Sequence, residues 1–126
     1  MFSNGMNRSY DDFMKDTNPK VQPLMDSLRK FCFSLGSNVV EDVRMHRVVF
    51  CKSFAFRWFV DIEPWEWGKK ATVLLKIQST DIPTNRSEAR TREIILNEDL
   101  DGNISWSSTQ MEAIQEGIRE AYNSIH

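Results

Sequence analysis

The chain has 126 residues, a formal net charge of −2 and 40% hydrophobic residues. This length fits one domain, whose core is large enough to fold without a metal or a disulfide. The composition excludes intrinsic disorder and collagen-like repeats, and no apolar run approaches the roughly 20 residues of a membrane span. The small net charge also argues against a polybasic DNA-binding protein.

The cysteine content and the N-terminus bear on the compartment. Cys32 and Cys51 are the only two cysteines. Both lie in apolar runs, and their spacing is not that of zinc ligands. Because residues 1–10 also lack the pattern of a signal peptide, we expect two buried free thiols in a cytoplasmic protein, with no metal and no cofactor. We expect residues 1–8 to form a flexible tail and residues 9–126 to form a single domain.

Two helices are predicted near the N-terminus. Ser9, with Asp12 three residues later, resembles a capping box and predicts a short helix over residues 10–15. An Asn-Pro pair then precedes apolar residues at three- and four-residue spacing. This pattern predicts a helix over about residues 19–35, and Pro23 loosens its first turns.

The middle of the chain is rich in β-branched and aromatic residues. Residues 48–51 and 54–62 are predicted to form two antiparallel strands joined by a tight turn, with Pro64 ending the second. Val39–Val43 is either a further strand or a turn that leads into this hairpin, and residues 65–70 are predicted as a connection. On the second strand the alternation places Phe54, Phe56, Trp58, Val60 and Ile62 toward the core, and Arg57, Phe59 and Asp61 on the outer face.

The last third of the chain completes the predicted fold. Strands are predicted over residues 71–78 and 90–96, with a short strand over residues 104–106, and a final helix begins at Ser107–Thr109. The apolar stripe of that helix consists of Met111, Ile114, Ile118, Tyr122 and Ile125. Gly117 interrupts the helix and weakens it. Short links between strands favour hairpins, so we predict a two-layer α+β fold. Its mainly antiparallel sheet of four to five strands packs against the N-terminal and C-terminal helices.

No known catalytic motif is present. The chain has no nucleophile elbow, phosphate-binding loop, dinucleotide fingerprint or zinc-protease motif. His46 and Cys51 form the one candidate pair of base and nucleophile. Burial of Cys51 in an apolar strand would raise its pKa and leave the thiol inert, so we expect no catalytic residues.

The distribution of charge is more informative than the total. The stretch from residue 44 to residue 57 contains bases and no acid, whereas residues 80–126 are mostly acidic. The bases of this stretch are Arg44, Arg47, Lys52 and Arg57, and His46 lies among them. A basic surface near the tryptophans Trp65 and Trp67 is typical of contact with phosphates or single-stranded bases. The competing interpretation is a solvated strand edge paired with acids, with a tryptophan folded back onto the core.

We therefore expect a non-catalytic binding module that contacts nucleic acid or a protein partner through this basic strand region. The alternative is a small-molecule pocket or weak enzyme between sheet and helices, lined by Phe54, Phe56, Trp58 and Met111. A cavity holding His46, Arg57 or Asp61 would favour that alternative. A homodimer through an unpaired sheet edge fits either hypothesis, and no membrane contact is expected.

The order of elements also carries a resemblance. It runs from Tyr10 through the first long helix, Val39–Arg44 and the hairpin, and on to the ending of the last helix. That ending consists of Glu116, Ile118, Ala121 and Tyr122. In this order the chain resembles a small family of uncharacterised bacterial and archaeal proteins. Its members occur alone or fused to the C-terminal side of domains similar to restriction-type nucleases. The resemblance implies a helix-capped antiparallel sheet and assigns no catalytic residue.

Overall fold

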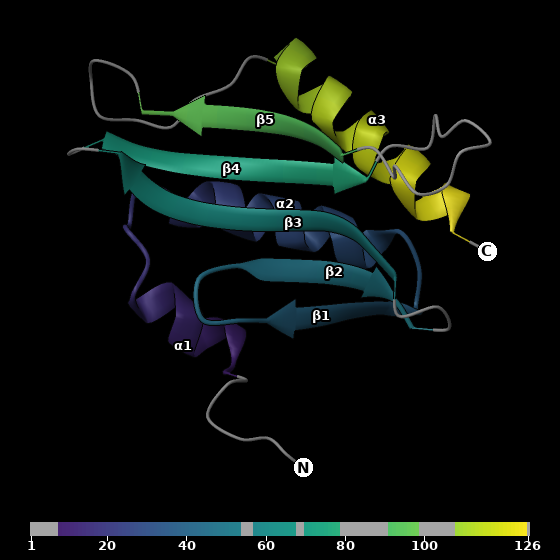
Figure 1. Cartoon of the computed structure of the whole chain (residues 1–126), viewed down its shortest axis with the longest axis horizontal. Coiled ribbons are helices and arrows are strands. Elements are labelled where there is room, and N and C mark those ends of the chain that lie inside the picture. The colour runs from purple at the N-terminus through teal and green to yellow at the C-terminus, as the bar shows by residue number, and fades with distance from the viewer. Residues whose placement is uncertain (1–7, 54–56, 68–69, 79–90, 99–107, 126) are drawn as a thin grey trace.

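The computed structural model describes residues 8–53, 57–67, 70–78, 91–98 and 108–125. Its elements are α1 (Tyr10–Lys15), α2 (Gln22–Ser34), β1 (Val39–Val43), β2 (Val48–Lys52), β3 (Arg57–Trp67), β4 (Lys70–Gln78), β5 (Thr91–Asn97) and α3 (Ser108–Ser124). The strands form one sheet in the order β1-β2-β3-β4-β5, and every neighbouring pair is antiparallel (Figure 1). The predicted α+β class is therefore confirmed, and Val39–Val43 is a strand.

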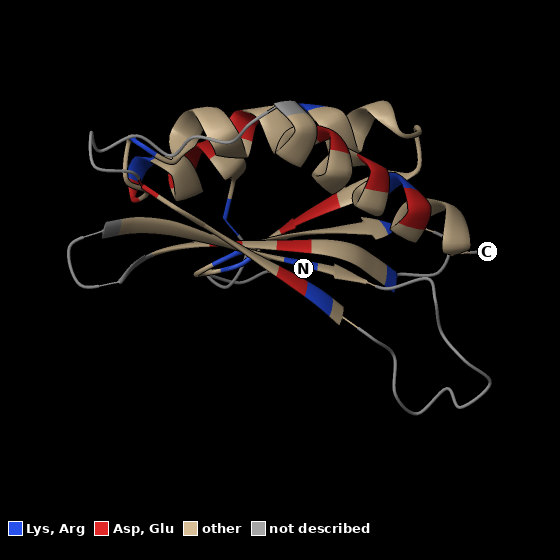
Figure 2. Ribbon diagram, turned by 90° about the horizontal axis from the view of Figure 1, so that it is seen from above, with Lys and Arg blue, Asp and Glu red and all other residues tan. Residues whose placement is uncertain are grey.

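The helices lie on one side of the sheet, and none of the described elements lies on the other side (Figure 2). We call these sides the covered face and the open face. The core fills the space between the two layers with apolar side chains from every element. Its largest fully buried members are Phe50, Phe59, Leu24, Met25, Leu28, Ile62, Leu75, Ile77, Ile114, Ile118, Val21 and Val48. No helix among the described residues is long and apolar enough to cross a bilayer.

The starts of the first two helices show where capping decides the boundary. The Ser9 hydroxyl oxygen accepts a hydrogen bond from the backbone N–H of Asp12 at 3.0 Å, which confirms the predicted start of α1. The predicted start of α2 is wrong by about one turn. The carbonyls of Asn18 and Pro19 accept from the N–H groups three residues later, at 2.9 and 3.3 Å, so a tighter turn leads into the helix. Pro23 then lies in the first turn of α2, where a helix does not need its missing N–H.

A group of polar and aromatic side chains ties α1 and α2 to β1. The Tyr10 hydroxyl donates to Asp26 at 2.8 Å. In the same group of side chains, Arg29 donates to both carboxylate oxygens of Glu41, at 2.6 and 3.2 Å. The Arg29 guanidinium also lies 4.2 Å from the centroid of the Tyr10 ring, so it links both helices to the edge strand.

The alternation predicted along β3 is wrong at its start, because the β2–β3 pairing contains an irregularity. The register shifts between Phe50 and Cys51, which introduces an extra residue into β3. Phe59, predicted to face outward, is 0% exposed and packs edge-on against Tyr122 of α3 with ring centroids 5.4 Å apart. Trp58, predicted to face the core, instead lies opposite Cys51 on the open face.

Pro64 does not end β3, contrary to the prediction, and part of the predicted connection belongs to the strand. Pairing with β2 reaches Ile62, and beyond that point β4 is the only described strand that pairs with β3. Proline is tolerated in such edge segments because it has no N–H to offer a second neighbour. Pro64 pairs with Val73, and β3 and β4 continue to Trp67 and Lys70.

Several predictions concern positions outside the described residues, namely Phe54, Phe56, Arg90, Ser107 and the strand over residues 104–106. The described part of the predicted fourth strand is β5, one residue longer at its C-terminal end. In α3, a Cβ atom on Gly117 would overlap a guanidinium nitrogen of Arg92. The glycine therefore lets that side chain cross the helix surface, a role that its low helix propensity does not indicate.

Candidate functional site

Three of the predicted basic residues lie in the turn that joins β1 to β2. Arg44 donates to Asp42 at 3.0 Å, and Arg47 lies 3.4 Å from the carboxylate of Asp61. His46 is exposed between them. At this end of the sheet each arginine therefore has an acidic partner, as the competing interpretation of the basic stretch expected.

Lys52 and Arg57 lie at the other end of β2 and directly opposite one another in the register. The ammonium group of Lys52 donates to the carbonyl of Ile125 at 2.6 Å and lies 4.1 Å from the ring centroid of Tyr122. It holds the end of α3 on the sheet, whereas Arg57 is exposed. Because the length of β2 separates them from the β1–β2 turn, the predicted bases do not form one continuous surface.

Asp61 is the most perturbed acid of the open face. It is buried although no described element covers that face, and burial raises its pKa. The cations of Arg47 and Lys76 oppose the increase. Asp61 pairs with Val49 on β2 and with Lys76 on β4, so it has an apolar neighbour on one side and a cation on the other.

An exposed apolar group lies farther along the open face. Trp65 and Ile95 are 38% and 56% exposed, and with Thr72 and Asn97 they surround a hollow of about 260 Å³. The Thr72 hydroxyl donates to the side-chain oxygen of Asn97 at 2.9 Å. Leu74 is partly buried and pairs with Ile95, which extends the apolar surface. We call Trp65, Thr72, Leu74, Ile95 and Asn97 the open-face patch.

Acidic side chains border this patch. Glu63 precedes Trp65 by two positions on β3, and Glu93 precedes Ile95 by two positions on β5. Side chains two positions apart on a strand point to the same face, so both carboxylates lie on the open face beside the apolar residues. Leu74 pairs with Glu63 on β3 and with Ile95 on β5. Glu63 therefore lies on the same face as the apolar surface and directly beside it.

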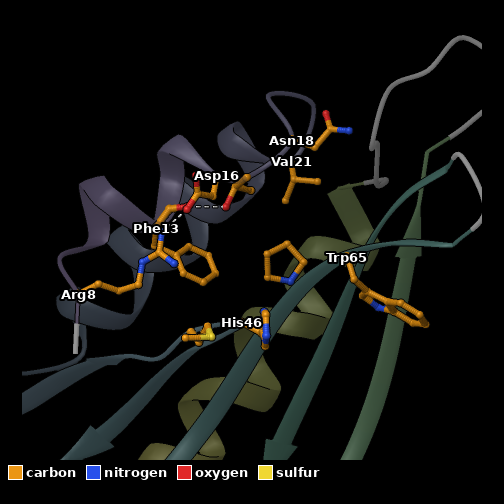
Figure 3. Close-up of a pocket in the computed structure, with 10 residues that line it drawn as sticks. Arg8, Phe13, Asp16, Asn18, Val21, His46 and Trp65 are labelled. Atoms are coloured by element: carbon orange, nitrogen blue, oxygen red, sulfur yellow. Dashed lines mark hydrogen bonds and ion pairs between the residues drawn. The ribbon is translucent and has the colours of Figure 1, made fainter. Parts of the chain in front are cut away.

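A second hollow lies at one end of the layer between α1 and the sheet. It has a volume of about 440 Å³ and is lined by Arg8, Phe13, Asp16, Thr17, Asn18, Val21, Met45, His46, Pro64 and Trp65. We call it the end cavity. Phe13 and Val21 face its interior, whereas the Trp65 ring extends away from it toward the neighbouring strands (Figure 3). Of the predicted site residues, His46 and Trp65 thus border the same cavity, but the tryptophan ring belongs to the open face. A cavity that holds His46 is what the small-molecule alternative expected, although neither Trp58 nor Met111, two of the lining residues predicted for it, borders this one.

One ion pair defines the polar side of the end cavity. Arg8 donates from Nη2 to the Asp16 carboxylate at 2.6 Å and to the Asp12 carbonyl at 2.7 Å. Its guanidinium lies 5.6 Å from the centroid of the Phe13 ring (Figure 3). Arg8, predicted to belong to the flexible tail, is therefore anchored to α1. The Thr17 hydroxyl donates inward to the Phe13 carbonyl at 2.8 Å.

The thiols and acids provide little for catalysis in the described part of the chain. Burial raises the pKa of both Cys32 and Cys51, which keeps the thiols protonated. Cys51 is only half-buried, less than predicted, and the length of β2 lies between it and His46. Among the described residues, no three His, Cys, Asp or Glu side chains are grouped as metal ligands. The Trp67 side chain lies outside the described residues.

Comparison with protein-family models, curated proteins and solved structures finds no match to this chain. The family resemblance noted from the order of elements therefore stays a prediction.

Sequence reasoning missed the end cavity, because four separate stretches of the chain supply its lining. The lining comes from α1 and the residues beside it, from the segment that precedes α2, from the β1–β2 turn and from β3. No local motif joins residues so far apart. Arg8 and Asp16 are eight residues apart, whereas side chains on a helix pair at three- and four-residue spacing, so the sequence held no signal for this ion pair.

Proposed function

We propose that this protein is a non-catalytic binding module that contacts a protein partner through the open-face patch. One observation carries the proposal: Trp65 and Ile95 expose 38% and 56% of their surface around a shared hollow. The sheet packs its helices on the other face, so burial in the core does not explain these side chains. Tryptophan is also a favoured anchor at protein interfaces.

The border of the patch favours one kind of partner segment. Glu63 and Glu93 lie next to the apolar surface. A segment that inserts an apolar side chain between Trp65 and Ile95 and flanks it with lysine or arginine would meet complementary charge. Lys76 pairs with Glu93 and offsets part of this negative charge, but a nucleic-acid backbone would still bring negative charge beside the Glu63 carboxylate.

The basic stretch supports a nucleic-acid partner less well than its sequence suggested. Arg44 and Arg47 have acidic partners, and Lys52 holds the end of α3. These bases also lie at two ends of β2, so they form two separate groups and not one continuous basic surface. We place the module in the cytoplasm, which the free thiols Cys32 and Cys51 favour.

Site-specific photo-crosslinking in cells tests the proposal. A benzophenone amino acid replaces Ile95 in the open-face patch, and the matched control places it at Glu120, an exposed position on α3. We expect a discrete crosslinked protein from position 95 and none from position 120. Mass spectrometry of the crosslinked peptide should find lysine or arginine beside the attachment point.

Affinity measurements with the identified partner complete the test. Trp65→Ala should weaken binding by about 30-fold, corresponding to loss of a central anchor of about 2 kcal/mol. Equal crosslinking from positions 95 and 120, or unchanged affinity of the alanine variant, would refute the assignment to this face. A crosslink to a second copy of the chain would replace the partner by a homodimer. Fluorescence anisotropy with single- and double-stranded oligonucleotides at about 50 mM salt should show no binding.

A further inference from the structure

The end cavity has the dimensions and chemistry of a small-molecule site, and Trp65 is the one residue that it shares with the open-face patch. Its volume of about 440 Å³ lies at the small end of the usual range of ligand pockets, about 300–1,000 Å³. Apolar side chains form one part of its lining, with Phe13, Val21 and Pro64 from three different segments. Met45 adds a flexible thioether that can adapt to different apolar groups.

The polar side of the cavity carries both signs of charge. Arg8 and Asp16 form an ion pair at 2.6 Å, and 75% of the Asp16 side chain is exposed. Arg8 uses Nη2 for its hydrogen bonds to Asp12 and Asp16, and no described residue accepts from its Nε or Nη1. The pair therefore offers donors from the guanidinium and acceptors from the carboxylate at the same rim.

We propose that the end cavity binds a free amino acid with an apolar side chain. Its carboxylate would accept hydrogen bonds from Arg8, and its ammonium group would donate to Asp16. The apolar side chain would then lie against Phe13, Val21 and Pro64. Each charge of the ligand meets an opposite charge of the protein. The Arg8–Asp16 ion pair then becomes a group of four alternating charges, and none of them is left without a partner.

Ligands with a single charge fit this arrangement less well. A carboxylate alone would gain Arg8 but would also lie beside the Asp16 carboxylate, which is bound to the same guanidinium. An amine alone would gain Asp16 but would also lie beside the Arg8 guanidinium. His46 also borders the cavity, and as either a donor or an acceptor it is compatible with a ligand that offers both kinds of polar group.

Titrations followed by NMR on the isotope-labelled full chain test the proposal. The probes are L-leucine and L-phenylalanine, with N-acetyl-L-leucine and L-leucinamide as matched derivatives that each lack one charge. We expect saturable shifts of the backbone signals of Thr17, Met45 and His46 with the free amino acids. Each derivative should bind at least ten times more weakly.

Two variants assign the effect to the cavity. Asp16→Asn should remove the preference for L-leucine over N-acetyl-L-leucine, because the ammonium group loses its partner. Glu116→Gln makes the same chemical change in a carboxylate paired with Arg119 on α3, away from the cavity, and should leave binding unchanged. Thermal melting followed by circular dichroism confirms that both variants fold.

Three outcomes would overturn the proposal. They are the absence of saturable shifts up to about 10 mM amino acid, equal binding of the singly charged derivatives, and shifts confined to residues outside the cavity. None of these outcomes affects the open-face patch, whose crosslinking test uses different residues.

Discussion

The covered and open faces of the same sheet differ in how completely their side chains are buried. On the covered face, residues such as Phe59, Leu75 and Ile118 are fully buried against one another. On the open face, ion pairs and partly exposed apolar groups share the surface, and Ile95 is more than half exposed. Packing therefore explains the residues of the covered face. The exposed apolar residues of the open face need another explanation, and the partner contact that we propose would supply it.

The largest expected effect tests this contrast with two neighbouring leucines of β4. Leu75 is fully buried on the covered face, whereas Leu74 is partly buried on the open face. Leu75→Ala should lower the free energy of unfolding by about 2–5 kcal/mol, because it leaves a cavity in the core. Leu74→Ala should cost about 1 kcal/mol or less. Urea unfolding measures both, and equal losses would show that the open face is covered in the folded protein.

A smaller effect is expected where the covered face joins the two N-terminal helices to β1. Arg29→Ala removes both hydrogen bonds to Glu41 and the contact with the Tyr10 ring. It leaves the largely buried Glu41 carboxylate without its cation, so we expect a loss of about 2 kcal/mol in urea unfolding.

The control for this change is Arg119→Ala, whose partner Glu116 is exposed on α3. Exposed ion pairs contribute little, so this variant should lose less than about 1 kcal/mol. If the two arginine variants lose the same stability, the Arg29 group does not act as a link between α1, α2 and β1.

Local sequence features predicted most of the fold. Period-two and helical spacing located the elements, and Ser9 marked the start of α1. The errors lie where a neighbouring strand decides the outcome. The bulge opposite Phe50 reverses the orientation of Phe59, and Pro64 is tolerated because β2 has already ended. Both facts depend on pairing between strands, and the pattern of a single strand does not contain that information.

The candidate site was less predictable than the fold. The sequence offered Trp65 as a candidate contact residue, because a large apolar side chain in an exposed segment often marks a contact surface. In the structure 38% of this residue is exposed. The sequence also grouped Arg44, Arg47, Lys52 and Arg57 by their nearness along the chain. The antiparallel hairpin places these bases at two ends of β2. The acids that pair with the first two, Asp42 and Asp61, lie outside the basic stretch of the sequence. A run of basic residues in the sequence shows that the segment is basic. It does not show which of these residues are neighbours on the surface, because that depends on which strand ends lie side by side.

Tyr122 tests how the end of the last helix is held on the covered face. Its hydroxyl group donates to the side-chain oxygen of Asn38, and its ring packs against Phe59. Tyr122→Phe keeps the ring and removes only the hydroxyl group, so we expect a loss of about 1 kcal/mol in urea unfolding. A loss above about 3 kcal/mol would show that this hydrogen bond holds more of the fold than the end of α3.

The smallest effect concerns Asp61 on the open face and depends on pH. Burial raises the pKa of this carboxyl group above its value in the unfolded chain. Between the two values the folded protein binds more protons than the unfolded chain, so this group lowers stability as the pH rises through that interval. Asp61→Asn removes the titration. The free energy of unfolding of the variant minus that of the natural protein should therefore increase from about pH 3 toward neutral pH, and then level off above the folded-state pKa.

The total change should stay near or below about 1 kcal/mol, since Arg47 lies 3.4 Å away and compensates part of the cost of burial. Urea unfolding at a series of pH values measures it, with the exposed pair partner Glu116→Gln as the acid-to-amide control. A difference that decreases with pH would mean that the attraction to Arg47 exceeds the cost of burial. The open face would then be stabilised by its ion pairs, and the contrast with the covered face would be smaller than the structure indicates.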